Sequence, residues 1–74
     1  MTPELTKKAI AANIEALRAH LSDCFLLSSE AFQAIKEGEQ NQAIGTILGL
    51  DRKLEDALAF CRAAVTLHRN GGAP

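Results

Sequence analysis

The sequence predicts an all-α protein, an antiparallel two-helix hairpin with a coiled-coil-like heptad seam. In two long stretches, apolar residues recur at alternating steps of three and four, which is the pattern of a helix that buries one stripe. A polar segment centred on Gly38 separates the stretches, and 74 residues allow one small domain. We expect a single domain over 1–74, with a helix over 3–37, a turn over 38–41, a helix over 42–69 and a tail over 70–74.

The first helix has a clear start and one apolar seam. Thr2 can cap the free backbone N–H groups, Pro3 suits the first helical position, and Glu4 complements the positive end of the helix dipole. The segments Ser22-Asp23 and Ser28-Ser29-Glu30 could cap a new helix, but the seam crosses both in phase, so we expect one continuous helix. The seam consists of Ile10, Ile14, Leu17, Leu21, Cys24, Ala31 and Ile35, with Ser28 as its polar member.

The second helix has a similar seam and a well-marked end. Asn70-Gly71-Gly72 accepts the left-handed conformation of a helix cap, and His68 and Arg69 place positive charge at the negative end of the dipole. The helix should therefore stop there. Its seam consists of Ile47, Leu50, Leu54, Ala57, Cys61, Ala64 and His68.

Gly45 and Gly49 weaken the second helix, because each glycine costs ~1 kcal/mol relative to alanine in a helix interior. In one interpretation, the segment from Gly45 to Gly49 is a small-xxx-small ridge that lets another helix approach closely. In the other, the helix breaks there and restarts with Asp51 as its N-cap, which would give three helices. We expect the unbroken helix.

A tight turn sets the pairing of the two helices, so that facing residues should have numbers adding to about 78. In this register each layer joins a large residue to a small one, which fills the space between the helices. A register with numbers adding to about 85 would set Cys24 against Cys61, but it needs a much longer loop. We prefer the first register, in which both cysteines are buried thiols about a heptad apart and form no disulfide.

Both helices carry more apolar surface than one seam can bury. One flank of the seam is apolar at six of eight positions, interrupted only by Arg18 and Asp51, and the other flank is mixed. A large exposed apolar patch marks an interface, so we expect two hairpins to join as a four-helix bundle. Leu26 lies on the outer face and is a candidate contact for a different partner. The predicted interface residues are Phe25, Phe32, Ile44, Leu58, Val65 and Leu26.

Charge and targeting signals limit the classes of partner. A formal net charge of -1 provides no clustered basic face, so we expect no binding to nucleic acid or to an anionic membrane surface. The N-terminal residues lack the apolar region of a signal peptide, and no run approaches the ~18 to 20 apolar residues of a membrane span. We expect a cytoplasmic protein whose cysteines stay reduced.

No arrangement of polar residues indicates catalysis or a cofactor. Each helix carries a His–Cys pair, but a closed zinc site needs four convergent ligands, which our register does not provide. Asp23, Glu30 and Glu37 repeat every seven residues, which is typical of a solvated acidic stripe that could dock a basic partner. The serines lack a positioned base, and the glycines lack the Gly-Lys-Ser/Thr ending of a phosphate loop. We expect no enzyme activity, no metal and no cofactor. The two pairs are His20 with Cys24 and Cys61 with His68.

These observations predict a non-catalytic interaction protein, a homo-oligomeric helical hairpin that binds a larger protein and blocks, chaperones or tethers it. In size and pattern the chain resembles several unrelated groups of small helical hairpins, including secretion-system co-chaperones and phage-encoded inhibitors of host proteins; this resemblance implies no functional residue. The alternative is a site for a small, nucleotide-like ligand between helices of neighbouring subunits. Its polar rim would come from Asn13, Arg18, His20 and Lys53.

Overall fold

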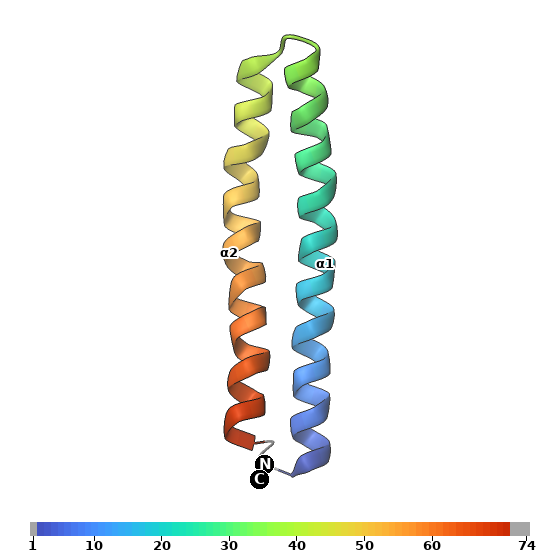
Figure 1. Ribbon diagram of the computed structural model, residues 1–74, viewed down its shortest axis with the longest axis vertical. Helices are drawn as coiled ribbons and strands as arrows, with labels where there is room; N and C mark the ends of the chain where they lie inside the picture. The colour runs from blue at the N-terminus through green and yellow to red at the C-terminus, as the bar shows by residue number, and fades with distance from the viewer. Residues whose placement is uncertain (1, 72–74) are drawn as a thin grey trace.

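Two long antiparallel helices make up the part of the chain that the computed structural model describes, residues 2–71 (Figure 1). Helix α1 spans Pro3–Lys36 and helix α2 spans Gln40–Gly71. The hairpin is a rod with extents of 54 × 14 × 13 Å. The predicted all-α hairpin is confirmed. Helix α1 ends one residue earlier than expected, and α2 begins two residues earlier and ends two residues later, so the first two residues of the predicted tail are helical; its remaining residues, 72–74, lie outside the described range.

The ends of α1 are formed by local backbone and side-chain interactions. The Thr2 hydroxyl accepts a hydrogen bond from the backbone N–H of Leu5 at 3.2 Å, and Pro3 follows at the first helical position. At the other end, Gly38 has a φ of 80°, in the left-handed region that glycine adopts without steric cost, and its N–H donates to the carbonyl of Ile35 at 3.1 Å. The chain therefore reverses direction at Gly38, which a side chain at this position would oppose.

Both helices are continuous. Helix α1 passes through its serine-rich sites without a break, and the Ser28 hydroxyl donates to the carbonyl of Phe25 at 2.9 Å. Helix α2 passes through Gly45 and Gly49, where a built Cβ would meet nothing within 4 Å. The expected unbroken helix is confirmed, and within the hairpin these glycines do not serve a close helix–helix approach.

Small side chains separate the two helices. Next to the turn, Ala31, Ala34 and Ala43 form a buried cluster, and no large side chain among the described residues is fully buried. Small residues let two helices pack closely, but they remove little apolar area from water. The buried residues are Thr6, Cys24, Ala31, Ala34, Ala43, Leu50 and Ala57.

Each helix is rotated about its own axis relative to the prediction, so that one of its two predicted seam rows, meaning residues seven apart, faces solvent. On α1 the row with Cys24 and Ala31 is buried as predicted, and on α2 so are Leu50 and Ala57. The other predicted rows are exposed, and Cys61 is exposed rather than buried. Rows on the opposite flank, whose residues are buried or half-buried and which end at Ala34 on α1, replace them, whereas Ala43 extends the row of Leu50 and Ala57 toward the turn. The exposed rows are Ile14, Leu21, Ser28 and Ile35 on α1, and Ile47, Leu54, Cys61 and His68 on α2.

The physical reason for this difference is the size of the residues beside the turn. A three-residue connection keeps the helices close where they meet, and alanines fit between them there better than isoleucines do. The layer beside the turn thus joins two small residues, Ala34 and Ala43, and the predicted alternation of large and small residues does not hold there.

The lengthwise register agrees to within two residues with the predicted register that has the shorter loop, in which facing residue numbers add to about 78. Lys53 pairs with Asp23 and His20 lies beside Asp56, and in both pairs the residue numbers add to 76. Thr6 and Gly71, which touch at the open end, have numbers adding to 77. The register that would set Cys24 against Cys61 is therefore wrong, and both cysteines are free thiols.

Candidate interaction surface

Exposed large apolar side chains from both helices lie along one side of the hairpin. Near the turn, an open groove is lined by Phe32 and Ile35 from α1 and by Ile44 and Ile47 from α2, which shows that the two helices present these rows to the same side. The heptad spacing continues each row along its helix. We call this surface the apolar face; it comprises Ile14, Leu21, Phe25, Phe32, Ile35, Ile44, Ile47, Leu54, Leu58 and Val65.

The two phenylalanines are the most exposed aromatic residues of the apolar face. Phe25 is 70% exposed and Phe32 is 65% exposed. The ammonium group of Lys36 lies 5.2 Å from the centroid of the Phe32 ring, within the range of a cation–π contact. Each large apolar side chain that moves from water into a packed interface contributes roughly 1.5–3 kcal/mol, so these rings favour association.

The other flank of the helix–helix contact is polar and internally paired. Lys53 Nζ donates to Asp23 Oδ2 at 3.3 Å, and His20 Nε2 lies 3.8 Å from Asp56 Oδ2. The His20 ring also contacts the Phe60 ring edge to face, with centroids 5.1 Å apart. The hairpin is therefore two-sided, with an apolar face on one flank and cross-helix polar contacts on the other.

Five of the six predicted interface residues lie on the apolar face, and Leu26 does not. Leu26 is exposed but follows Phe25 directly, about 100° further round the helix, so it points away from that face. Leu5 and Leu48 are the other large apolar residues that are exposed off the face among the described residues. The sequence prediction missed the exposure of Ile14, Leu21, Ile35, Ile47 and Leu54 because it assigned them to the seam between the helices.

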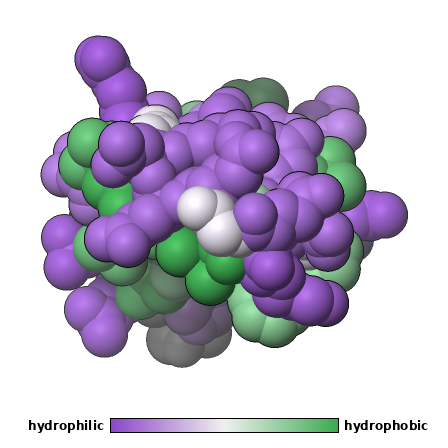
Figure 2. All heavy atoms as spheres, turned by 90° about the horizontal axis from the view of Figure 1, so that it is seen from above, coloured by the Kyte–Doolittle hydropathy of each residue, from purple (hydrophilic) through white to green (hydrophobic). Residues whose placement is uncertain are grey.

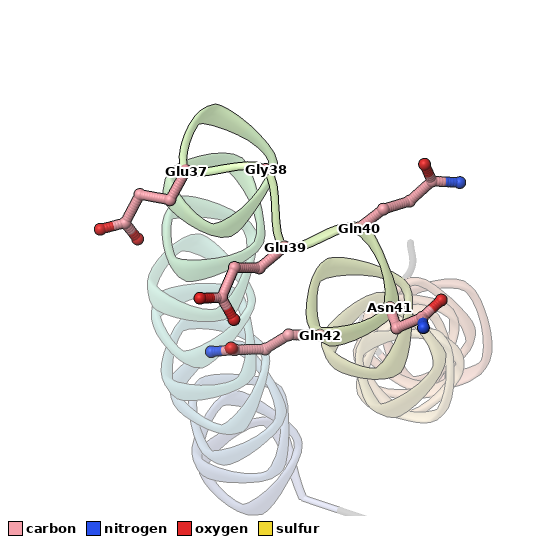
Figure 3. A pocket seen from close by; sticks show the side chains of 6 residues that line it. All are labelled: Glu37, Gly38, Glu39, Gln40, Asn41 and Gln42. Carbon is pink, nitrogen blue, oxygen red and sulfur yellow. The ribbon is translucent and has the colours of Figure 1, made fainter.

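The turn end is polar and has a shallow hollow. Seen from this end, the cap of the molecule is mostly hydrophilic, and hydrophobic side chains appear at its sides (Figure 2). In the hollow, the side chains of Glu39 and Gln42 lie alongside each other, whereas those of Glu37 and Gln40 point away (Figure 3). Apart from this pair, the side chains point in different directions. Its lining residues are Glu37, Gly38, Glu39, Gln40, Asn41 and Gln42.

Most of the residues predicted for a ligand-binding rim already have partners within the hairpin. Asn13 Nδ2 donates to the carbonyl of Ala9 at 2.9 Å, and His20 Nδ1 lies 3.1 Å from the carbonyl oxygen of Ala16. Lys53 is paired with an aspartate, as described above. Within residues 2–71, no three His, Cys, Asp or Glu side chains are arranged to hold a metal ion. The polar flank thus stabilises the hairpin itself.

Comparisons of the chain with protein-family models, with curated proteins and with solved structures gave no match. Neither described helix is long and apolar enough to cross a membrane. The fold and its surface define the class of the protein as a helical hairpin with one exposed apolar face. A function can therefore be proposed from the physical properties of that face.

Proposed function

We propose that the protein is a non-catalytic interaction module, in which hairpins associate through their apolar faces into a four-helix bundle and the assembly binds a larger protein that it blocks, chaperones or tethers. One observation supports this best. Ten large apolar side chains lie exposed on a single face, whereas the contact between the two helices buries mostly alanines. A protein that works as a lone hairpin gains nothing from this distribution, since exposed apolar faces of this extent cause association.

The accessible surface area supports the same proposal. The hairpin exposes 5690 Å². A folded monomer of 7.9 kDa exposes roughly 4,400 Å². The excess of about 1,300 Å² is larger than the ~800 Å² that each partner buries in a standard protein interface.

Stability considerations point the same way. A domain below about 70–80 residues rarely obtains more than ~3–5 kcal/mol from one hydrophobic core, and small helical proteins often add stability by oligomerising. Here the core consists mainly of Ala31, Ala34, Ala43 and Ala57, with Leu50 as its largest member. Association through the apolar face would supply the burial that this core lacks.

A larger partner requires surface that remains free after the hairpins associate. Leu26, Leu5 and Leu48 stay exposed because they lie off the apolar face. Such residues on the outer sides of a helical bundle can contact a groove or helix of another protein. Leu26, in the half of α1 that is nearer to the turn, is the residue that we propose for this contact.

Size-exclusion chromatography with light scattering tests the first part of the proposal. We expect at least twice the chain mass of 7.9 kDa at micromolar concentration, and a monodisperse monomer would contradict the proposed function. For the second part, we propose affinity capture from the native host with the wild type and with Leu26→Asp in parallel. A partner captured by both proteins equally would exclude Leu26 as its contact. A rise in Tm on adding nucleotides would instead favour the ligand-binding alternative.

A further inference from the structure

We infer that the second copy covers the apolar face in an antiparallel orientation, with a twofold axis perpendicular to the helices and close to Leu21 and Leu54. The inference rests on the proposed association of two hairpins and specifies how they meet. Two symmetric arrangements bring the faces together. If the axis is parallel to the helices, both turns lie at the same end and α1 packs on α2 of the second copy. If it is perpendicular, the turns lie at opposite ends and α1 packs on α1.

The charge distribution along the rod favours the perpendicular axis. The open end, residues 3–16 and 61–71, has four basic and two acidic side chains, whereas the turn end, residues 28–49, has one basic and three acidic side chains. With both turns at one end, the two acidic ends would lie side by side and so would the two basic ends, and charges interact over ~8 Å at physiological salt. In the antiparallel arrangement, each acidic turn end lies beside a basic open end. The residues are Lys7, Lys8, Arg62, Arg69, Glu4 and Glu15 at the open end, and Glu30, Glu37, Glu39 and Lys36 at the turn end.

Burial of the apolar face places the axis near the middle of the rod. Full overlap of the two copies covers most of the face only if the axis passes close to mid-length, where Leu21 of α1 and Leu54 of α2 lie at nearly the same height. Each leucine would then pack against its own counterpart in the second copy. A leucine pair on the axis of symmetry is well suited to a dry interface core.

This placement also accommodates the charged residue that interrupts the apolar face on α1. Arg18 of one copy reaches the ring of Phe25 of the second copy, which permits a cation–π contact, and the small Ala11 faces Phe32 of the second copy. With the axis parallel to the helices, Phe25 would instead lie beside the carboxylate of Asp51, which a phenyl ring does not favour. The side chains of α1 therefore agree with the charges at the two ends.

Zero-length carbodiimide cross-linking of the wild-type protein tests the orientation without any substitution. In one hairpin, Lys7 near the start of α1 and Glu37 just after its end are 30 residues apart, or about 45 Å, so no cross-link can join them within a chain. In the antiparallel dimer, Lys7 of one copy lies beside Glu37 of the second copy. We expect mass spectrometry of the cross-linked dimer to identify Lys7 or Lys8 joined to Glu37 or Glu39, and mixed isotope labelling to show that the link is intermolecular.

A distance measurement gives an independent result. We expect nitroxide labels on Gln40→Cys, in a Cys24→Ala/Cys61→Ser background, to be about 45 Å apart in the antiparallel dimer, whereas adjacent turns would place them about 10–20 Å apart. A dimer with the short distance and without the cross-links would overturn the orientation but leave the proposed function intact. A monomeric wild type would overturn both. If the labelled background does not dimerise, the wild-type cross-links alone decide between the two orientations.

Discussion

Thr6 and Gly71 touch across the open end of the hairpin: a Cβ built on Gly71 would lie 2.9 Å from Oγ1 of Thr6 and 3.2 Å from its Cγ2. Thr6 is buried, so its side chain occupies the space that a larger residue at position 71 would need. The sequence indicated Gly71 as a residue that ends the helix. In the structure it is the last residue of α2 and allows close approach of the two helices.

Gly71→Ala tests this close approach. Alanine is better than glycine in a helix by ~1 kcal/mol, but the new methyl group would overpack against Thr6 at a typical cost of ~1–3 kcal/mol. We expect a net loss of about 1 kcal/mol, seen as a Tm lower by roughly 4–8 °C when thermal unfolding is followed by circular dichroism. Adding Thr6→Ala removes both close atoms, so Gly71→Ala should then become neutral or stabilising. Additive effects of the two substitutions would show that the residues do not interact.

The alanine layer beside the turn predicts a second substitution effect. Ala43 is 2% exposed and belongs to the cluster with Ala31 and Ala34. Ala43→Leu should force the helices apart and lower the free energy of unfolding by about 1–3 kcal/mol, measured by chemical denaturation. Ala59→Leu is the matched control on the same helix, because Ala59 is exposed and should tolerate leucine. Equal effects of the two variants would show that the layer is not tightly packed.

The helices, the turn and the lengthwise register follow from local features of the sequence. Thr2 and Pro3 define a helix start, Gly38 supplies the left-handed residue of the turn, and a short connection limits how far one helix can shift along the other. These features act over a few residues, which is why a single sequence is enough to recognise them.

The rotation of each helix about its axis does not follow from the apolar pattern. The row containing Cys24 and Ala31 belongs to two overlapping stripes, and hydrophobicity alone does not say which stripe faces the other helix of the same chain. Residue size gives the missing signal, because Ala34 and Ala43 flank a short turn where only small side chains fit. For the same reason the apolar face was predicted only in part: Leu21 and Leu54 were assigned to the seam.

Gly45 and Gly49 offer a test of which surfaces take part in association. Both glycines lie away from the ends of α2 and are exposed to solvent, and a methyl group at either position would contact nothing within 4 Å. Since neither lies on the apolar face, Gly45→Ala and Gly49→Ala should each stabilise the protein by up to ~1 kcal/mol and leave the mass in solution unchanged. If either variant dissociates the oligomer, a helix packs against this glycine pair, and the small-xxx-small interpretation is correct.

Phe25→Asp tests the apolar face itself. In the hairpin alone Phe25 is 70% exposed, so the substitution should leave the helices intact, with an unchanged far-ultraviolet circular dichroism spectrum at low temperature. In the associated state it would bury an unpaired carboxylate at a cost of several kcal/mol. We expect the dissociation constant of the dimer to rise at least ~100-fold, measured by sedimentation velocity over a concentration series. Phe32→Asp should act in the same way.

Leu26→Asp is the control for this experiment, because it places the same charge one residue further along α1 but off the apolar face. It should retain the wild-type mass, since both positions are exposed but point in different directions from the helix. If Leu26→Asp dissociates the oligomer and Phe25→Asp keeps the wild-type mass, the self-association surface is the outer side of α1. The apolar face would then be free to bind the larger partner, which reverses the roles that we propose for the two surfaces.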